Sequence, residues 1–268
     1  MNRIEILKEI GIAPVWKARA AASGAAASGA EITQADAGKP LVRASFTEHK
    51  PENRPPSGSS GRAQSKMPDV KPAADSGERA AKIARMDWPA LKDAVANCRA
   101  CTLCNGRTNT VFGAGDETAK WMIIGEAPGQ EEDRLGEPFV GQAGKLLDGM
   151  LAALDLTRNV NVYIANVLKC RPPGNRDPQP AEVAQCAPHL TRQIELLRPT
   201  LIVLMGRFAA QAILETDASI ASLRGRVFTY RGTPAIVTYH PAYLLRSLTE
   251  KAKAWEDLLF ARKTFSGT

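Results

Sequence analysis

The sequence predicts an α/β domain built on a four-stranded, mainly parallel sheet with helices on both faces. Short apolar runs alternate with segments of helical periodicity from about residue 121 to the C-terminus. Each run is too short for a buried helix and leads to a glycine or a polar residue, as the strands of a buried sheet do. Strands that alternate with helices are typical of parallel sheets joined by crossover helices.

The expected strands are apolar runs at Trp121–Ile124, Val162–Leu168, Thr200–Met205 and Ala235–Tyr239. Helices are expected where apolar residues recur at helical spacing, near Ala143–Leu154, Ala181–Leu197, Phe208–Leu214 and Lys251–Lys263. One more helix, around Trp88 to Val95, precedes the first strand and leads into the first cysteines.

Polar residues stand at the ends of three of these strands. Glu126 follows the first strand, Asn166 lies near the end of the second, and His240 follows the fourth. The loop after the first strand, GEAPGQEEDRLGEPFVGQAG, combines glycines with acids, and open α/β sheets place ligand sites at such strand ends. We therefore expect the three groups to converge on one site, with an ordinary strand–loop–helix connection as the alternative.

Composition divides the chain into three parts. Residues 20–82 are rich in Ala, Ser, Gly, Pro and charge and lack apolar periodicity, which predicts a disordered linker. Residues 83–268 hold all the expected strands and form the predicted globular domain. Residues 1–19 form a short amphipathic stretch ahead of the linker.

The amphipathic stretch is interpreted as a docking peptide. Its apolar residues recur at helical spacing up to Gly11, and Trp16 follows in PVWK. A helix this short is marginal alone in water, which favours ordering on a partner; packing on the chain's own core is the alternative. LKEIGIAPVWKAR resembles the peptide by which the psi subunit of the bacterial clamp loader docks onto chi, which implies a replication-associated partner.

Length and composition indicate a cytoplasmic protein. The chain has 268 residues and 44% apolar content, enough for a core, and no apolar run approaches the ~20 residues of a membrane span. Its five cysteines are then expected to be metal ligands or free thiols. The net charge of +7 suits a polyanionic partner, although residues 1–85, with 14 Lys/Arg against 9 Asp/Glu, carry most of it.

The cysteines predict a metal centre. Cys98 and Cys101 form a C-x2-C pair, and Cys170 and Cys186 follow the second strand. Four thiolates from two chain regions suit either tetrahedral zinc or an iron–sulfur cluster, and their spacing leaves both open. Cys104 extends the first pair to C-x2-C-x2-C. Small buried hydrophobic cysteines are the alternative.

Five blocks carry a resemblance to a known family. They are C-x2-C-x-L-x3-R at 98–107, GEAPGQEED at 125–133, PFVGQAG at 138–144, NVLKCRPPGNRDP at 166–178 and HPAYLLR at 240–246. In this order and at these separations they resemble the family 4 uracil-DNA glycosylases, the iron–sulfur-containing type of many bacteria and archaea. The resemblance covers about two thirds of the chain and omits the N-terminal extension.

The resemblance implies a three-layer α/β/α domain with a structural [4Fe–4S] cluster. Carried over by motif, the cluster ligands are Cys98, Cys101, Cys170 and Cys186, and Cys104 stands where the family requires no ligand. The implied activity is base-excision repair: hydrolysis of the N-glycosidic bond of deoxyuridine in single- or double-stranded DNA. The implied enzyme is monofunctional and monomeric, and flips the base out of the stack.

Each chemical role implied by the family falls on a suitable residue. His240 would donate a hydrogen bond to uracil O2, and Glu126 would orient water and favour the cationic sugar. Asn166 would pair with O4 and N3–H of uracil, and Phe139 would stack on the flipped base. Backbone amides near Gly125, Ala127 and Gln130 would complete the pocket.

The DNA-binding residues are expected in two segments. Leu244 or Leu245 would fill the gap left by the flipped base, and Tyr243 and Arg246 accompany them, Arg246 holding a phosphate. The proline-rich loop after the second strand would add phosphate contacts from Lys169, Arg171 and Arg176.

The same residues allow one other class of function and exclude one related enzyme. A metal-stapled DNA-binding protein without catalysis would keep the same cysteines and basic residues. A relative that traps its product covalently through a histidine is excluded, because RPPGNRDPQP contains no histidine and His189 lies inside an expected helix.

Overall fold

The computed structural model describes residues 74–267. The expected docking peptide at residues 1–19 and the expected linker up to residue 73 lie outside these residues. One boundary differs from the prediction, because α2 (Ala74–Ile83) is helical where a linker was expected up to residue 82. The sequence ERAAKI in this helix consists mostly of strong helix formers, and Ile83 is buried. The alanine content of α2 matches that of the expected linker, so composition alone assigns these residues to the linker.

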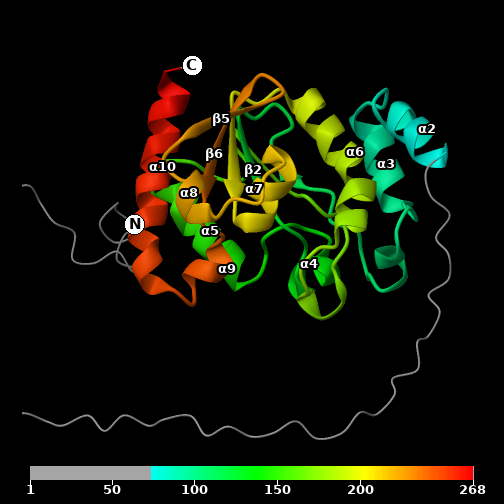
Figure 1. Ribbon diagram of the computed structural model, residues 1–268, viewed down its shortest axis with the longest axis horizontal. Helices are drawn as coiled ribbons and strands as arrows, with labels where there is room; N and C mark the ends of the chain where they lie inside the picture. The colour runs from blue at the N-terminus through cyan, green and yellow to red at the C-terminus, as the bar shows by residue number, and fades with distance from the viewer. Residues whose placement is uncertain (1–73, 268) are drawn as a thin grey trace, which may run out of the picture. The chain divides into compact units, whose positions relative to one another are not determined.

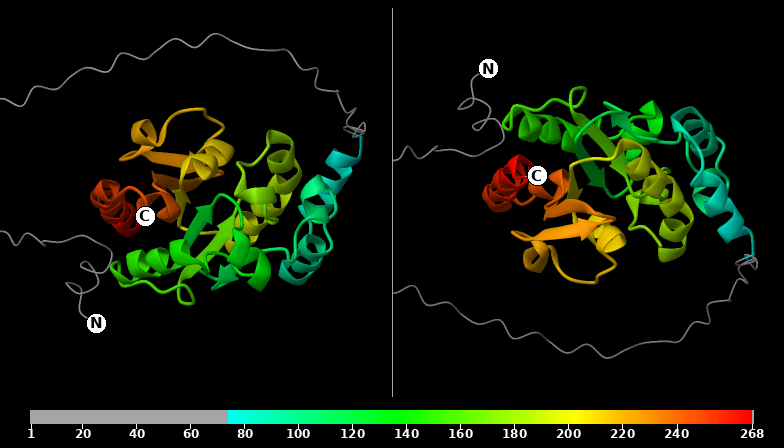
Figure 2. Two further views of the ribbon diagram at one scale, coloured as in Figure 1. Left: turned by 90° about the horizontal axis from the view of Figure 1, so that it is seen from below. Right: turned by 90° about the horizontal axis from the view of Figure 1, so that it is seen from above.

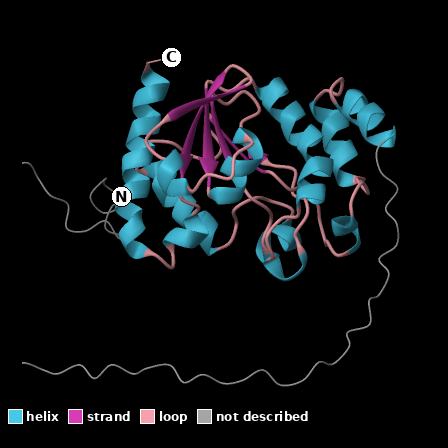
Figure 3. Cartoon of the chain, in the orientation of Figure 1, coloured by secondary structure: helices cyan, strands magenta, loops and turns pink. Residues whose placement is uncertain are grey.

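Six strands form one mixed, mostly parallel sheet in the order β1-β3-β2-β4-β6-β5 (Figure 3). The four predicted strands are its parallel centre, and each begins and ends within two residues of the expected position. They are β2 (Trp121–Gly125), β3 (Val162–Asn166), β4 (Leu201–Met205) and β6 (Thr233–Thr238).

The predicted count of four strands was wrong, because two short antiparallel strands flank the parallel centre. These are β1 (Ala114–Gly115) beside β3 and β5 (Val227–Tyr230) beside β6. β1 has two residues and β5 is partly exposed along its length, so neither shows the apolar run of a buried strand. β5 enters β6 through Arg231 and Gly232, whose positive φ values of 48° and 83° suit a two-residue hairpin turn.

Helices cover both faces of the sheet, as predicted (Figures 1 and 2). Ile123 of β2 packs on one face with Leu147, whereas its neighbour Met122 packs on the other face with Ile194. Alternate residues of one buried strand therefore supply two separate cores. The covering helices are α5 (Gln142–Ala152) and α10 (Lys251–Ser266) on the first face, and α6 (Pro180–Leu197) and α7 (Arg207–Leu214) on the second.

The remaining helices are short, except α3, and occupy the ends of the domain. The sequence predicted α3 but not α4, because a six-residue helix with a single apolar residue, Leu135, has no apolar periodicity. Within residues 74–267 no helix is long and apolar enough to cross a membrane. The remaining elements are α3 (Trp88–Ala96), α4 (Gln130–Leu135), α8 (Ile220–Leu223), α9 (Pro241–Leu244) and 3-10 turns at Thr102–Asn105, Pro173–Asn175 and Leu248–Glu250.

A buried carboxylate on α10 holds the last parallel strand in place. Asp257 is 2% exposed and accepts hydrogen bonds from Thr238 Oγ1 at 2.8 Å and Arg224 Nε at 2.7 Å. Asp257→Ala should therefore lower the free energy of unfolding by about 3 kcal/mol, since the half-buried guanidinium of Arg224 loses its nearest carboxylate. Urea unfolding followed by circular dichroism measures the change. Glu256→Ala is the matched control, because that neighbouring side chain is 74% exposed and lies farther from Arg224, at 3.7 Å; an equal loss in both variants would contradict the prediction.

Candidate active site and cysteine centre

A cavity of about 700 Å³ opens at the carboxyl ends of the parallel strands. Glu126, Asn166 and His240 all line it, as their positions at the strand ends predicted. The parallel register explains this convergence: Gly125 pairs with Asn166 across β2 and β3, so the residues that follow reach the same edge. The sheet therefore places a carboxylate, an amide and an imidazole around one space.

Asn166 is the last residue of β3 and presents an unsatisfied group. Its side chain is 2% exposed, and its Oδ1 has no hydrogen-bond partner among the described residues. A buried amide oxygen without a partner is costly, so it marks a position where a ligand donor fits. Gly125 permits this placement, since a Cβ there would clash with Asn166 Oδ1 and lie 2.6 Å from the Phe139 ring.

His240 is held in one tautomer. It is the residue before α9, and its Nδ1 accepts a hydrogen bond from the amide of Ala242 at 3.1 Å. A neutral ring with Nδ1 as acceptor carries its proton on Nε2. Burial lowers the pKa of His240 to about 4, an effect that the charge of Arg246 increases and that of Glu132 opposes. The imidazole is therefore a neutral donor at physiological pH.

Phe139 forms an aromatic wall beside that histidine. The two rings stack with centroids 5.4 Å apart and planes 28° from parallel. Phe139 has a positive φ of 54°, an uncommon conformation that neighbouring contacts must hold. Arg158 Nη2 donates to its carbonyl at 2.9 Å, and Glu132 Oε1 accepts from the amides of Val140 and Gly141 at 2.9 and 3.0 Å. The predicted stacking residue is thus fixed from both sides.

Glu126 has an unusually weak acid group. Burial raises the pKa of its carboxyl to about 7; the nearby charge of Asp177 raises it further and that of Arg207 lowers it. Asp177 and Arg207 also line the cavity and form an exposed ion pair at 3.4 Å. These two residues were not predicted from the sequence. Arg207 could have been, because it follows Gly206 at the carboxyl end of β4, where polar residues were expected to line the site.

The acidic run after β2 has a structural role that the sequence analysis did not foresee. Glu132 secures the Phe139 loop, and Asp133, which is 5% exposed, accepts from the amides of Thr108 and Asn109. Glu131 pairs with Arg134 on the surface. Two of the three acids therefore clamp loops beside the site, which explains their place in the motif without a chemical role.

The predicted amide pocket is only partly assembled around the cavity. Ala127 lines the cavity, and Gly125 lies beneath Asn166 and Phe139. Gln130 is the exposed first residue of α4 and is not among the cavity-lining residues. The cause is α4 itself, which turns the chain away where the sequence suggested a loop.

The residues of the HPAYLLR segment, expected to bind DNA, lie in different surroundings. Tyr243 and Arg246 line the cavity, and Leu245 is 42% exposed. Leu244 is 1% exposed and belongs to the core beneath α5 and α10, so its assignment to DNA was wrong. At the end of the short helix α9 successive leucines point to different sides, about 100° apart around the axis, which a list of residue types does not show.

The basic residues of the proline-rich loop also differ from the prediction. Lys169 is 2% exposed and donates to the Asn166 carbonyl, so it cannot contact a phosphate and that assignment was wrong. Arg176 lines the cavity but makes a two-pronged ion pair with Glu182 at 2.6 and 2.9 Å. Arg171 is half-buried and donates to Asn175 Oδ1 at 2.7 Å. Only Arg171 and Arg176 keep access to solvent.

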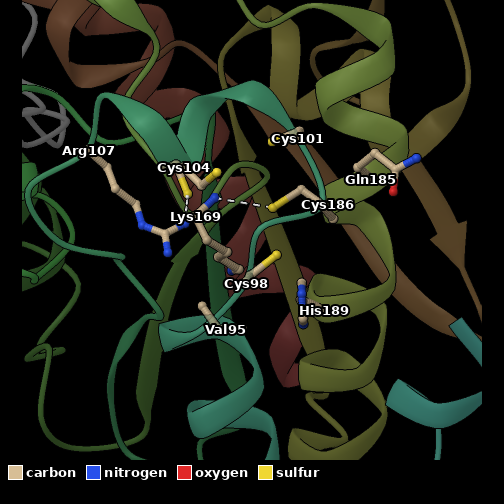
Figure 4. A pocket seen from close by; sticks show the side chains of 11 residues that line it. Val95, Cys98, Cys101, Cys104, Arg107, Lys169, Gln185, Cys186 and His189 are labelled. Carbon is tan, nitrogen blue, oxygen red and sulfur yellow. Dashed lines mark hydrogen bonds between the residues drawn. The ribbon is translucent and has the colours of Figure 1, made fainter. Parts of the chain in front are cut away.

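All five cysteines line a second pocket, between α3, α6 and the end of β3 (Figure 4). The two predicted pairs, Cys98 with Cys101 and Cys170 with Cys186, are brought together there from distant parts of the chain. Cys104 lines the same pocket, and its Sγ lies 3.4 Å from Asn105 Oδ1.

Cationic and amide donors point at three of these sulfur atoms. Arg107 donates to Cys170 Sγ at 3.1 Å, Arg79 approaches Cys98 Sγ at 3.6 Å, and the Lys169 amide donates to Cys186 Sγ at 3.3 Å. Burial raises the pKa of the Cys186 thiol to about 12. Hydrogen-bond donors of this kind stabilise sulfur atoms that carry negative charge. A bound metal centre would keep these cysteines as negatively charged thiolates.

The donor set fits a cluster held by thiolates. No three His, Cys, Asp or Glu side chains within residues 74–267 are arranged to hold a single metal ion. Four cysteines from two chain regions nevertheless share one pocket with hydrogen-bond donors to sulfur, and this is the ligand chemistry of iron–sulfur proteins.

Comparison with known proteins assigns the family. Residues 112–259 match the family described as the uracil DNA glycosylase superfamily. The chain belongs to this superfamily. Within it, the chain belongs to the type-4 uracil-DNA glycosylases, because relatives of that type are matched over most of their length. The resemblance carried by the five sequence blocks is confirmed.

Three type-4 uracil-DNA glycosylases illustrate the match. The protein of Archaeoglobus fulgidus is 48% identical over 159 residues, which cover 56% of this chain and 79% of that protein. The protein of Sulfurisphaera tokodaii is 44% identical over 190 residues, 66% of this chain and 86% of that protein. The protein of Thermotoga maritima is 41% identical over 165 residues, 61% of this chain and 85% of that protein.

Two histidines of this type-4 glycosylase, the half-buried His240 and the buried His189, should show opposite tautomers. His240 should remain neutral with the proton on Nε2 and begin to titrate only near pH 4, because burial disfavours its charged form. His189 faces the Arg79 guanidinium through Nε2 at 2.8 Å and should carry its proton on Nδ1. NMR of protein with nitrogen-labelled histidine distinguishes the two. A charged His240 at neutral pH, or one protonated at Nδ1, would contradict the assignment.

Proposed function

We propose that this chain is a uracil-DNA glycosylase of base-excision repair. It hydrolyses the bond between C1′ of deoxyribose and N1 of uracil in DNA, releasing uracil and leaving an abasic site. The observation that carries the proposal is that two groups line one cavity: a neutral imidazole with Nε2–H and a buried amide with an unpartnered oxygen. Membership of the type-4 family supports the same reaction.

Asn166 and Phe139 recognise the base. The unpartnered Oδ1 of Asn166 accepts from N3–H of uracil, and its amide group donates to O4. Cytosine presents the opposite pattern of donor and acceptor on this edge, so a fixed amide rejects it. The base stacks on Phe139, a contribution on the order of 1–3 kcal/mol.

His240 and Glu126 stabilise the charges that form as the bond breaks. Nε2–H of His240 donates to uracil O2 while the base becomes an anion, a contribution on the order of 3 kcal/mol. Because the ring is already neutral, it supplies this hydrogen bond without a proton transfer. Glu126, as carboxylate, orients the attacking water and favours the cationic sugar. The described lining of the cavity contains no lysine, which supports a monofunctional enzyme using water.

DNA binds across the mouth of the cavity. The exposed Leu245 fills the gap left by the flipped base, and Tyr243 lies beside it. Arg246 and Arg207 are exposed at the rim and meet phosphates, where the Arg207–Asp177 pair is weak enough to exchange partners. We propose that the monomer is the DNA-binding unit.

The proposed cofactor is a structural [4Fe–4S] cluster. Cys98, Cys101, Cys170 and Cys186 hold it, and the cluster supplies a cross-link between α3 and the segment after β3 rather than electrons. Cys104 is left outside the ligand set. The donors from Arg79, Arg107 and the Lys169 amide stabilise the thiolates.

The N-terminal part of the chain serves recruitment in this proposal. Residues 1–19 dock onto a replication-associated protein, and the following linker raises the local concentration of the glycosylase domain near newly made DNA. These residues lie outside those that the structure describes, so the proposal stands on their amphipathic sequence alone.

Uracil release from a labelled single-stranded oligonucleotide with one deoxyuridine tests the reaction. The protein should release uracil and leave an alkali-labile site, and it should not act on a matched strand that carries thymine. His240→Ala should lower kcat by about 10²- to 10³-fold, the effect of losing one preorganised donor. Affinity for an oligonucleotide with an abasic-site analogue should change little. Absence of release from iron-complete protein that still binds DNA would favour the non-catalytic alternative.

The pH dependence of kcat/KM should report Glu126. Its carboxylate is the active form and its pKa is raised to about 7, so activity should rise with pH through that value and then level off. His240 adds no step there because its pKa is lowered to about 4. Glu126→Gln should remove the step, and Asp177→Asn should move it to lower pH, since one repelling charge is gone. A step unaffected by both changes would assign it to another group.

A further inference from the structure

Lys169 touches both the cysteine pocket and the residue proposed to read the base. Its side chain lines the cysteine pocket and is 2% exposed (Figure 4). Its ammonium donates to the carbonyl of Asn166 at 2.9 Å and to Gln193 Oε1 at 2.7 Å. The lysine therefore contacts both sites.

The partners of Lys169 are themselves fixed. Its amide donates to Cys186 Sγ at 3.3 Å, and its carbonyl accepts from the amide of Val111 at 2.8 Å. Gln193 is fully buried, and its Nε2 donates to the carbonyl of Phe112 at 2.9 Å. A fixed donor between fixed acceptors leaves the end of β3 little freedom to shift.

The charge of Lys169 needs a negative partner. Both acceptors of its ammonium are neutral, and a buried ammonium without a counter-charge is strongly destabilising. Cys170 is the next residue in the chain, and Cys186 accepts a hydrogen bond from the Lys169 amide, so two of the proposed cluster ligands lie beside it. As cluster-bound thiolates they supply the missing charge within the same pocket.

We propose that Lys169 is a positioning residue that couples the cysteine centre to base recognition. Thiolates bound to the cluster balance its charge and keep the ammonium in place, and the ammonium holds the Asn166 carbonyl so that the side chain faces uracil. The inference rests on the proposed function and the proposed cluster. It differs from a purely structural role because it predicts a specific loss of base affinity in a folded, cluster-containing protein.

Lys169→Met tests the coupling, since methionine fills similar space without the ammonium. The dissociation constant for free uracil, measured by calorimetry, should rise about tenfold, the scale of one hydrogen bond. Affinity for DNA with an abasic-site analogue should stay within about twofold, because that complex does not use Asn166. The reduction potential of the cluster should fall, because a buried positive charge beside it has been removed.

Lys120→Met is the matched control. Lys120 is exposed at the opposite end of β2, and the same substitution there should change none of the three measurements. Unchanged uracil affinity in iron-complete Lys169→Met would overturn the inference while leaving the proposed function intact. Failure of the unaltered protein to bind or release uracil would refute the proposed function. It would also refute the proposal that Lys169 positions Asn166 for uracil.

Gln193→Met tests the position of the Lys169 ammonium separately from its charge. It removes one acceptor of the ammonium but keeps the positive charge beside the cysteines. The dissociation constant for uracil should rise about two- to fivefold with no change in reduction potential. If Lys169→Met loses its iron, that loss supports the proposal that the lysine charge and the cluster thiolates stabilise each other. Gln193→Met then tests whether the ammonium positions Asn166. Unchanged uracil affinity in Gln193→Met would overturn that positioning role.

Discussion

The carboxyl end of β3 is the constraint on which the rest of the site depends. Within five residues the chain passes from Asn166, in the cavity, to Cys170, in the cysteine pocket. The amides of Val167 and Leu168 donate to the carbonyls of Gly125 and Glu126, each at 3.0 Å, so the pairing with β2 continues past the strand. A shift at the cysteines would therefore move both the amide and the carboxylate of the active site.

Several charged side chains near the site hold loops in place through hydrogen bonds to the backbone. Glu132 and Arg158 hold the loop of Phe139 from opposite sides, and Asp133 fixes the segment after the first cysteines. Their hydrogen bonds go to backbone groups, which restricts the positive-φ conformation of Phe139. Rigid loops of this kind hold a base-binding pocket at a fixed width, and that is the condition for rejecting bases by shape and hydrogen bonding.

Desolvation gives the site its chemistry. The same enclosure keeps His240 neutral and holds Glu126 near its point of half-ionisation at neutral pH. Both effects follow from the cost of placing charge away from water, and neither needs a strong ion pair. Burial lowers the pKa of Lys169 to about 8, as it lowers that of His240, and the neighbouring Cys186 and Cys170 oppose that shift.

The sequence by itself determined the parallel centre of the sheet, the main helices, the cysteine set and the strand-end positions of Glu126, Asn166 and His240, because each depends on local periodicity or motif. The tertiary structure decided which side chains face the cavity. It buried Leu244 and Lys169, turned Gln130 to solvent and brought Asp177 and Arg207 to Glu126. Orientation and burial depend on contacts between segments distant in the chain, and residue type and spacing alone do not specify those contacts.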